Sequence, residues 1–161
     1  MLTAERVRQI LVYDPETGVF VWRLKTAAKT VVGKRAGTHP PMGYSVIRVA
    51  KRNYYAHVLA WVYMTGKWPH KQIDHINRVR GDNRWSNLRE ATNKQNHENS
   101  SPPSTSISGV KGVSRCKQTG RWLSRITHNG TMRNLGRFSD FGDAVAARRA
   151  AEDRLFTHHV R

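Results

Sequence analysis

The segment IDHINRVRGDNRWSNLREATNKQN, residues 73–96, combines side chains that could hydrolyse a phosphodiester bond. Asp74 directly precedes His75, and the segment also contains Asn83, Asn87 and Asn96. An imidazole with a pKa near neutrality is the natural general base for activating a water molecule. Carboxylate and carboxamide oxygens are hard ligands that suit Mg²⁺, which usually keeps several waters. The segment therefore predicts a base beside a divalent-metal site.

Short regular elements must bring these side chains together. The pattern predicts a strand over 72–77 and a returning strand over 87–91, joined by a loop. Thr92, followed three residues later by a Gln, is a capping-box pattern, so a helix should begin there. The order strand, loop, strand, helix should place the Asp-His pair against the Asn in the first turns of that helix.

The charge of the chain indicates its partner. The 161 residues include 28 Lys and Arg against 11 Asp and Glu, a net charge of +17. Residues 1–100 carry 17 basic and 7 acidic side chains, and residues 101–161 carry 11 and 4. Both parts should therefore bind a polyanion, since phosphate contacts release condensed counterions. Composition alone does not separate a ribosomal-type or histone-like binder from a chain whose charge only makes its surface soluble.

Several other classes are disfavoured. Cys116 is the single cysteine, so neither an internal disulfide nor a cysteine zinc cluster can form. The N-terminal sequence MLTAERVRQI has no apolar signal region, and no apolar run is long enough to span a bilayer. We expect a soluble, cytoplasmic protein, located in the host cytoplasm if a phage encodes it.

A linker is predicted over the Ser/Pro-rich stretch 100–108, SSPPSTSIS, which has almost nothing to bury. It should separate a region over 1–99, whose core motif spans 72–99, from a module over 109–161. We therefore expect two domains of unequal size.

The first region should open with a helix after Thr3 and contain a strand over 19–22. A hairpin should follow around a turn at 51–53. The apolar stretch HVLAWVYMT should then form a buried helix that ends at Gly66.

The 109–161 module is predicted to be three antiparallel strands and one helix. Asn129-Gly130 is the strongest hairpin signal, because both residue types tolerate positive φ. Ser139 should cap a helix over about 140–157, whose apolar stripe packs on the strands. The basic pair at 148 and 149 is interpreted as solvent-facing charge on this helix.

The Asp-His segment resembles the HNH (ββα-metal) endonucleases of phage and homing type. Further phrases of the chain share the resemblance, namely YDPETGVFVWR, GYSVIRV, AHVLAW and TGKWP. The resemblance spans most of residues 11–99.

This resemblance implies roles for individual residues of the segment. It implies that His75 is the general base and that Asn87 braces the loop. It also implies that Asp74 and Asn96 hold one divalent ion, Mg²⁺ or alternatively Mn²⁺. His97 is the rival ligand to Asn96, which we favour.

Other side chains near this segment have two interpretations. His57 either lines the site or, as we favour, caps a buried helix. The four arginines of the segment could contact phosphates or simply be solvated, and the two that we expect to bind DNA are Arg84 and Arg89.

The downstream module resembles the Apetala-type DNA-binding domain of plant ethylene-response factors. The matching stretches are VKGV at 110–113, GRW at 120–122, NLGRF at 134–138 and AVAARRAAE at 144–152. The resemblance implies a sheet lying in the major groove. The residues it nominates for DNA contact are Lys111, Arg115, Trp122, Arg125 and Arg133. Trp122 could equally be a core residue, and departures at positions 114 and 125 mean that base preference does not transfer.

Together these resemblances predict an α+β fold: a ββα-metal nuclease region with additional hairpins, linked to a three-stranded antiparallel sheet with one helix. The predicted function is metal-dependent endonucleolytic cleavage of double-stranded DNA. The alternatives are a non-catalytic, sequence-specific DNA-binding protein and an RNA-binding ribosomal-type protein.

Overall fold

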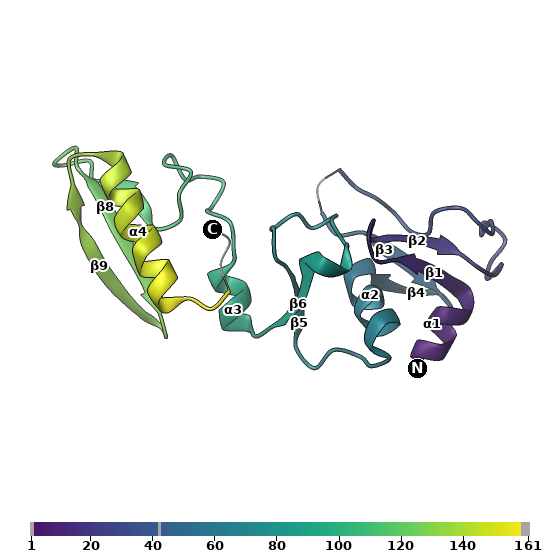
Figure 1. Cartoon of the computed structure of the whole chain (residues 1–161). Coiled ribbons are helices and arrows are strands. Elements are labelled where there is room, and N and C mark those ends of the chain that lie inside the picture. The colour runs from purple at the N-terminus through teal and green to yellow at the C-terminus, as the bar shows by residue number, and fades with distance from the viewer. Residues whose placement is uncertain (1, 42, 159–161) are drawn as a thin grey trace. The chain divides into compact units, whose positions relative to one another are not determined.

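The computed structural model describes residues 2–41 and 43–158. The chain forms two compact units, Met1–Thr92 and Asn93–Arg161 (Figure 1). Both units combine helices with small antiparallel sheets, so the expected α+β class is confirmed. None of the helices formed by the described residues is long and apolar enough to cross a bilayer.

The first unit begins with helix α1 (Ala4–Ile10). Thr3 caps it as expected, because its side-chain oxygen accepts from the Arg6 N–H at 3.2 Å. The chain then turns directly into strand β1 (Leu11–Asp14), which pairs with β2 (Val19–Trp22).

A second hairpin joins β3 (Val46–Val49) to β4 (Arg52–Tyr55). Its turn residues are Ala50 and Lys51, both at positive φ, so the turn predicted at 51–53 was placed too late in the chain. The sequence there lacks a strong turn pair such as Asn-Gly, and register is weakly specified without one.

Helix α2 (Ala56–Thr65) follows β4 immediately and ends at Gly66, whose φ of 77° is the left-handed cap expected from the sequence. Its buried face packs with α1 and the two hairpins in one apolar core. This core supports the third hairpin. Its fully buried members include Val7, Ile10, Leu11, Phe20, Ile47, Leu59 and Val62.

The third hairpin consists of β5 (Gln72–His75) and β6 (Leu88–Ala91). Within it, Asp74 pairs with Arg89 and the last residue of β5 pairs with the first of β6. A 3₁₀ turn, η1 (Trp85–Asn87), leads into β6. Along the chain, helix α3 (Asn93–Glu98) begins two residues after β6 ends, close to the predicted start.

The second unit contains α3 and a three-stranded sheet of β7 (Val113–Arg115), β8 (Trp122–His128) and β9 (Thr131–Phe138). The residues at 129 and 130 form the predicted turn at positive φ. Helix α4 (Phe141–Leu155) packs on β8 and β9. Its N-cap is Asp140 rather than the predicted Ser139, because the Asp140 carboxylate accepts from the Asp143 N–H at 3.1 Å.

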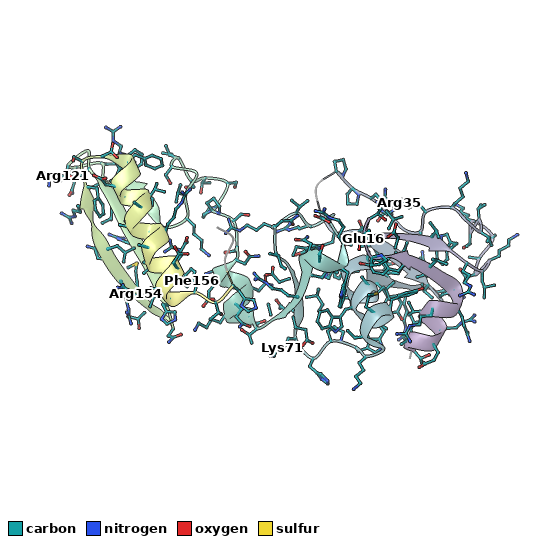
Figure 2. All side chains as sticks on the ribbon, viewed as in Figure 1. Glu16, Arg35, Lys71, Arg121, Arg154 and Phe156 are labelled. Carbon is teal, nitrogen blue, oxygen red and sulfur yellow. The ribbon has the colours of Figure 1, made fainter. Side chains whose placement is uncertain are left out.

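Arg148 is buried, which contradicts its interpretation as solvent-facing charge. Its guanidinium donates to the Arg125 carbonyl at 2.6 Å and to Glu152 Oε1 at 2.9 Å, and it lies over the Phe156 ring. A Cβ on Gly112 would collide with this guanidinium, so glycine admits the close approach. Other charged side chains are exposed, among them Lys71, Arg121 and Arg154 (Figure 2).

The two compact units divide before α3, whereas the sequence predicted that residues 93–99 belong to the N-terminal region. Contacts of Glu98 explain the difference, because its buried carboxylate accepts from the Thr157 N–H at 3.1 Å. That residues 1–99 and 109–161 fold and function as separate domains, joined by the linker, stays a prediction.

Candidate active site

Two ionisable side chains follow each other at the end of β5. Asp74 and His75 lie on opposite faces of the strand, as neighbours on a strand must, yet both are buried. Burial on both faces is uncommon for a strand of an antiparallel hairpin, which usually has one solvated face. The hairpin is therefore enclosed on both sides at the position where the sequence predicts chemistry.

The imidazole of His75 is oriented by Asn83. Nε2 of His75 lies 3.2 Å from Oδ1 of Asn83, and both side chains are buried. A carboxamide oxygen can only accept, so His75 carries its proton on Nε2 and its lone pair on Nδ1. Burial lowers the pKa of His75, and the Asn83 contact and the charges of Asp74 and Asp82 only partly oppose this effect. The imidazole of His75 is therefore neutral at pH 7.

Asn87 ties together the loop between β5 and η1. Its Oδ1 accepts from the Asn77 N–H at 2.9 Å, and its Nδ2 donates to Asn77 Oδ1 at 3.0 Å and to the Asp82 carbonyl at 2.8 Å. Within the loop Arg78 has a φ of 65°, which is unfavourable for a residue other than glycine. These hydrogen bonds are the ones expected if Asn87 braces the loop.

The position of Asn83 is set by the β1–β2 hairpin. The buried Tyr13 hydroxyl donates to the Asn83 carbonyl at 2.6 Å, and the Trp85 N–H donates to the Pro15 carbonyl at 2.9 Å. Gly18 has a φ of 71°, and a side chain there would collide with the backbone of Asn83. The turn of this hairpin therefore supports the loop that orients the imidazole.

The contact between Asn83 and His75 was not predicted from the sequence, which gave Asn83 no task beyond its loop. An Asn after Gly-Asp is typical of turns, so its residue type carried no functional signal. Only its place eight residues after the His, inside the loop that must close over it, could have suggested the contact.

His57 lies beside His75, contrary to the interpretation that we favoured. The N-cap of α2 is Tyr55, and His57 is buried in the first turn with its ring 4.9 Å from that of His75, edge to face. Burial lowers the pKa of His57 to about 3, and the neighbouring His75 adds to the effect. Among the described residues, none hydrogen-bonds to the buried Nδ1 of His57. His57 therefore forms a neutral wall of the site.

The two arginines nominated for phosphate contact both bind carboxylates. Arg89 donates to Asp74 Oδ2 from Nη2 at 3.0 Å and from Nε at 3.1 Å. Arg84 donates to both oxygens of Asp82, at 2.6 and 2.8 Å, and these bonds lower the pKa of Asp82 to about 2. The structure therefore places Arg89 at the site as the partner of its carboxylate. The half-exposed Arg84 stays a predicted phosphate contact.

The metal donors nominated from the sequence fall in different compact units. Asp74 belongs to the first unit, and α3, which carries Asn96 and His97, belongs to the second. Asn96 is half-buried and His97 is exposed. Within 2–41 and 43–158, no three His, Cys, Asp or Glu side chains come together as a metal-holding group. A carboxylate and a carboxamide still suit Mg²⁺, because this ion fills its remaining positions with water.

The nominated DNA-contact residues of the second unit do not share one face of the sheet. Trp122 is half-buried and packs against an aromatic ring at the start of α4, with ring centroids 4.7 Å apart, so it lies on the α4 side of the sheet. Arg115 pairs with Trp122, and Arg133 pairs with Ile126, which is buried under α4. Directly paired residues share a face, so both arginines leave the sheet on the α4 side. Arg125 lies on the opposite face, where it lines a hollow together with residues of α3.

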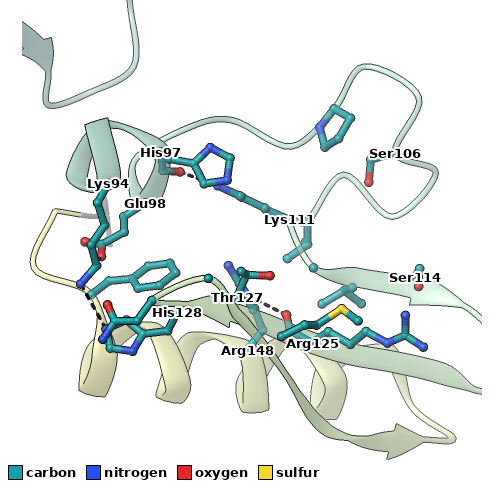
Figure 3. Close-up of a pocket in the computed structure, with 18 of the residues that line it drawn as sticks. Lys94, His97, Glu98, Ser106, Lys111, Ser114, Arg125, Thr127, His128 and Arg148 are labelled. Carbon is teal, nitrogen blue, oxygen red and sulfur yellow. Dashed lines mark hydrogen bonds and ion pairs between the residues drawn. The ribbon is translucent and has the colours of Figure 1, made fainter. Parts of the chain in front are cut away.

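Lys111 lies outside the sheet, at a hollow of about 1040 Å³ within the second unit (Figure 3). Its ammonium group donates to the His97 carbonyl at 2.5 Å and to Ser100 Oγ at 2.6 Å. Figure 3 shows Lys111 extending toward His97 while Arg125 lies along the sheet. Lys111 therefore hydrogen-bonds to the C-terminal end of α3 and to the residues that follow it.

Comparison with known proteins identifies the class to which this site belongs. A model of the HNH endonuclease family matches residues 54–98, which include the Asp-His pair and the loop that closes over it. The chain belongs to the HNH endonuclease family. It is similar to Protein 3.8 of Escherichia phage T7, with 33% identity over 91 residues that span 56% of this chain and 74% of that protein.

The HNH match includes α3 of the second unit but ends at residue 98. No solved structure matches the chain. The family match ends before 109–161, so the Apetala-type resemblance stays a prediction.

Proposed function

We propose that the protein is a metal-dependent DNA endonuclease of phage and homing type, with His75 as its general base. The observation that carries the proposal is the buried, neutral imidazole of His75, held by Asn83 directly beside Asp74. A base must be unprotonated at working pH and fixed in one tautomer to accept a proton from water, and His75 meets both requirements.

Asp74 and Asn96 would hold the divalent ion, for which we propose Mg²⁺, with Mn²⁺ as the alternative. When bound, the ion would stabilise the charge that develops on the leaving oxygen. Arg89 already neutralises Asp74 in this structure, so it would have to share that carboxylate with the ion. Asn87 would keep the loop closed over the base through its bonds across the loop.

Double-stranded DNA is the proposed substrate, because the charge of +17 is distributed over both halves of the chain. We further propose that the second unit is a targeting domain of Apetala type. The face of its sheet that carries Arg125, away from α4, would enter the major groove, where donors and acceptors identify bases. Arg115 and Arg133 would then contact the backbone from the two edge strands, while Lys111 and Trp122 would serve the structure of the unit.

One observation favours a second candidate, a DNA-binding protein without nuclease activity. The ion pair between Arg89 and Asp74 satisfies the carboxylate that a metal would need. Retention of an oriented base argues against this candidate, because binding DNA alone does not need a neutral His75 held by Asn83.

Supercoiled plasmid separates the two candidates. The full chain should nick it when Mg²⁺ or Mn²⁺ is present and not in EDTA, and His75→Ala should lose about 10²- to 10⁴-fold in rate, the usual contribution of a general base. His70→Ala, a change at an exposed histidine, is the matched control and should nick like the wild type. No nicking with any divalent metal would leave the binding protein. Equal nicking by His75→Ala would overturn the proposal that His75 is the general base.

A further inference from the structure

A chain of four rings extends from His75 to the surface of the first unit. The rings of His75 and His57 lie 4.9 Å apart. His57 stacks on Tyr55 at 5.4 Å with only 12° between their planes, and Tyr44 lies 5.1 Å from His57. Tyr44 also contacts Tyr55 at 5.3 Å and His75 at 5.9 Å. The four rings therefore form one contiguous aromatic cluster.

The β3–β4 hairpin builds this cluster by its register. Val46 pairs with Tyr55, and the ladder continues beyond the strands because the Ala56 N–H donates to the Ser45 carbonyl at 2.9 Å. One step further along, the same pairing sets the tyrosine at 44 opposite the histidine at 57. The two tyrosines thus sit where the hairpin meets the start of α2, beside the proposed base.

Exposure changes sharply along the cluster. His75 and His57 are 4% and 6% exposed, whereas Tyr44 and Tyr55 are 39% and 51% exposed. The guanidinium of Arg80 lies over the Tyr44 ring, 5.2 Å from its centroid. One end of the cluster is therefore the buried imidazole of His75, and the other is a half-exposed aromatic surface with a cation over its Tyr44 ring.

Such a surface has the features of a nucleobase platform. Aromatic rings bind bases by stacking regardless of sequence, and a nearby cation attracts the backbone phosphate. Within an intact duplex the faces of each base are covered by its neighbours, so only an unstacked or extruded base can occupy the platform. A platform in ring contact with the general base of the site would take a nucleotide flanking the phosphate that is attacked.

We propose that Tyr44 and Tyr55 stack an unstacked DNA base that flanks the phosphate cleaved at His75. The substrate of the site is then DNA with a displaced base at the cleavage point, whether extruded by the protein or already unpaired at a gap, flap or mismatch. The inference rests on the proposed nuclease function, because that function defines which phosphate the stacked base flanks. The stacking itself does not depend on it.

A base-removal scan with full-length protein tests the proposal. Duplexes that span the mapped cleavage site each carry one abasic position near the cleaved bond, and kcat/KM is measured for each. At one flanking position, loss of the base should lower wild-type kcat/KM roughly 5- to 150-fold, the usual worth of one base stacked on an aromatic ring. Tyr44→Ala and Tyr55→Ala should lose a similar factor on intact DNA and little more on the abasic duplex.

Two controls separate ring loss from unfolding. Tyr44→Phe and Tyr55→Phe keep the rings and should respond to base removal as the wild type does. Val12→Ala, a change at an exposed residue of β1, should cleave like the wild type. A flat abasic scan, or alanine variants that respond to base removal as the wild type does, would overturn the platform.

A binding measurement without divalent metal distinguishes failure of the platform from failure of the nuclease. The fluorescent base 2-aminopurine is placed at each position in turn, and its emission is followed as protein is added. The wild type should change the emission at one position, and the double variant Tyr44→Ala/Tyr55→Ala should not. If this result is obtained but no cleavage is seen, the stacking proposal holds and the nuclease proposal fails. If cleavage is seen but the emission change does not depend on the tyrosines, the nuclease proposal holds and the stacking proposal fails.

Discussion

Nε2 of His75 lies 3.2 Å from Oδ1 of Asn83, and this contact links the strand that carries the proposed base to the loop that closes over it. Asn83 is in turn held through its carbonyl by Tyr13, a residue 70 positions earlier in the chain. The burial of Tyr13, with the charges of Asp14 and Asp82, raises the pKa of its hydroxyl well above the usual range. Tyr13 therefore remains a hydrogen-bond donor at any working pH.

Asn83→Ala should lower kcat for plasmid nicking about 10- to 100-fold, the usual effect of removing a partner that orients a side chain of the site. The imidazole would lose the acceptor that selects its tautomer, while the residues proposed to bind DNA remain. Asn53→Ala, at an exposed position of β4, is the control. An unchanged kcat in Asn83→Ala would contradict the orienting role.

The pH dependence of nicking provides a second readout of the same contact. Asn83→Asp keeps an acceptor and adds negative charge, which favours the protonated imidazole and raises the pKa of His75. Because the base works in its unprotonated form, the acid limb of the pH–rate profile should move to higher pH. A limb at the wild-type position would show that Asn83 does not face the base during the reaction.

Local pattern was sufficient to predict that Asp74, His75 and Asn87 lie close together. All three belong to one hairpin, where strand periodicity and turn chemistry determine which side chains meet. The helical caps at Thr3 and Gly66 were predicted for the same reason, since a cap depends on residues one turn away.

Contacts between distant segments were not predictable in this way. His57 reaches His75 because α2 packs against β5, and Arg148 is buried because Gly112 lets the β7 segment approach α4. A long cationic side chain on a helix has the same local pattern whether it points to solvent or under a sheet. Whether the residue at 96 or at 97 binds the metal stays a prediction, because both lie in a different compact unit from the Asp-His pair.

Removal of Arg89 should expose competition between its guanidinium and a metal for Asp74. In EDTA, Arg89→Ala should lower the free energy of unfolding by about 3 kcal/mol, because a buried carboxylate loses this ion pair. Added Mg²⁺ or Mn²⁺ should raise the melting temperature of this variant more than that of the wild type, since the ion supplies the missing charge. Calorimetry over a metal titration measures both effects.

Arg84→Ala is the matched control for that experiment, because Arg84 also pairs with an aspartate but is half-exposed. Exposed ion pairs contribute little, so this variant should lose much less stability than Arg89→Ala and should keep the wild-type metal response. Equal metal-induced shifts in the wild type, Arg89→Ala and Arg84→Ala would mean that no ion binds at Asp74.

His57 should make the folded state sensitive to acid. Its pKa of about 3 lies below the ordinary value of 6.5, so the unfolded chain binds a proton more readily than the folded one. The resulting stability is fully present above pH 6.5 and is lost as the pH falls toward 3, at up to about 1.4 kcal/mol per pH unit. Urea unfolding at pH 7, 6 and 5 in EDTA should show a smaller loss for His57→Phe than for the wild type. Parallel pH dependences would show that His57 is accessible to protons in the folded state.

Arg148 should stabilise the second unit. Its exposed neighbour Arg149 provides the control. Arg148→Met keeps much of the buried stem but leaves the Arg125 carbonyl without this donor and Glu152 without its partner. We expect a loss of about 3 kcal/mol, the usual cost of removing one partner of a buried ion pair. Arg149→Met should change stability by less than about 0.5 kcal/mol.

Hydrogen exchange locates the loss caused by Arg148→Met. Amides of β8 and α4 should exchange faster in this variant, while those of α1, α2 and β5 should keep wild-type protection, because the two compact units have separate cores. Plasmid nicking below the melting temperature should retain its metal dependence, since the proposed base and metal ligands lie outside β8 and α4. Equal exchange in Arg148→Met and Arg149→Met would show that the buried guanidinium contributes no net stability and is replaceable by apolar packing.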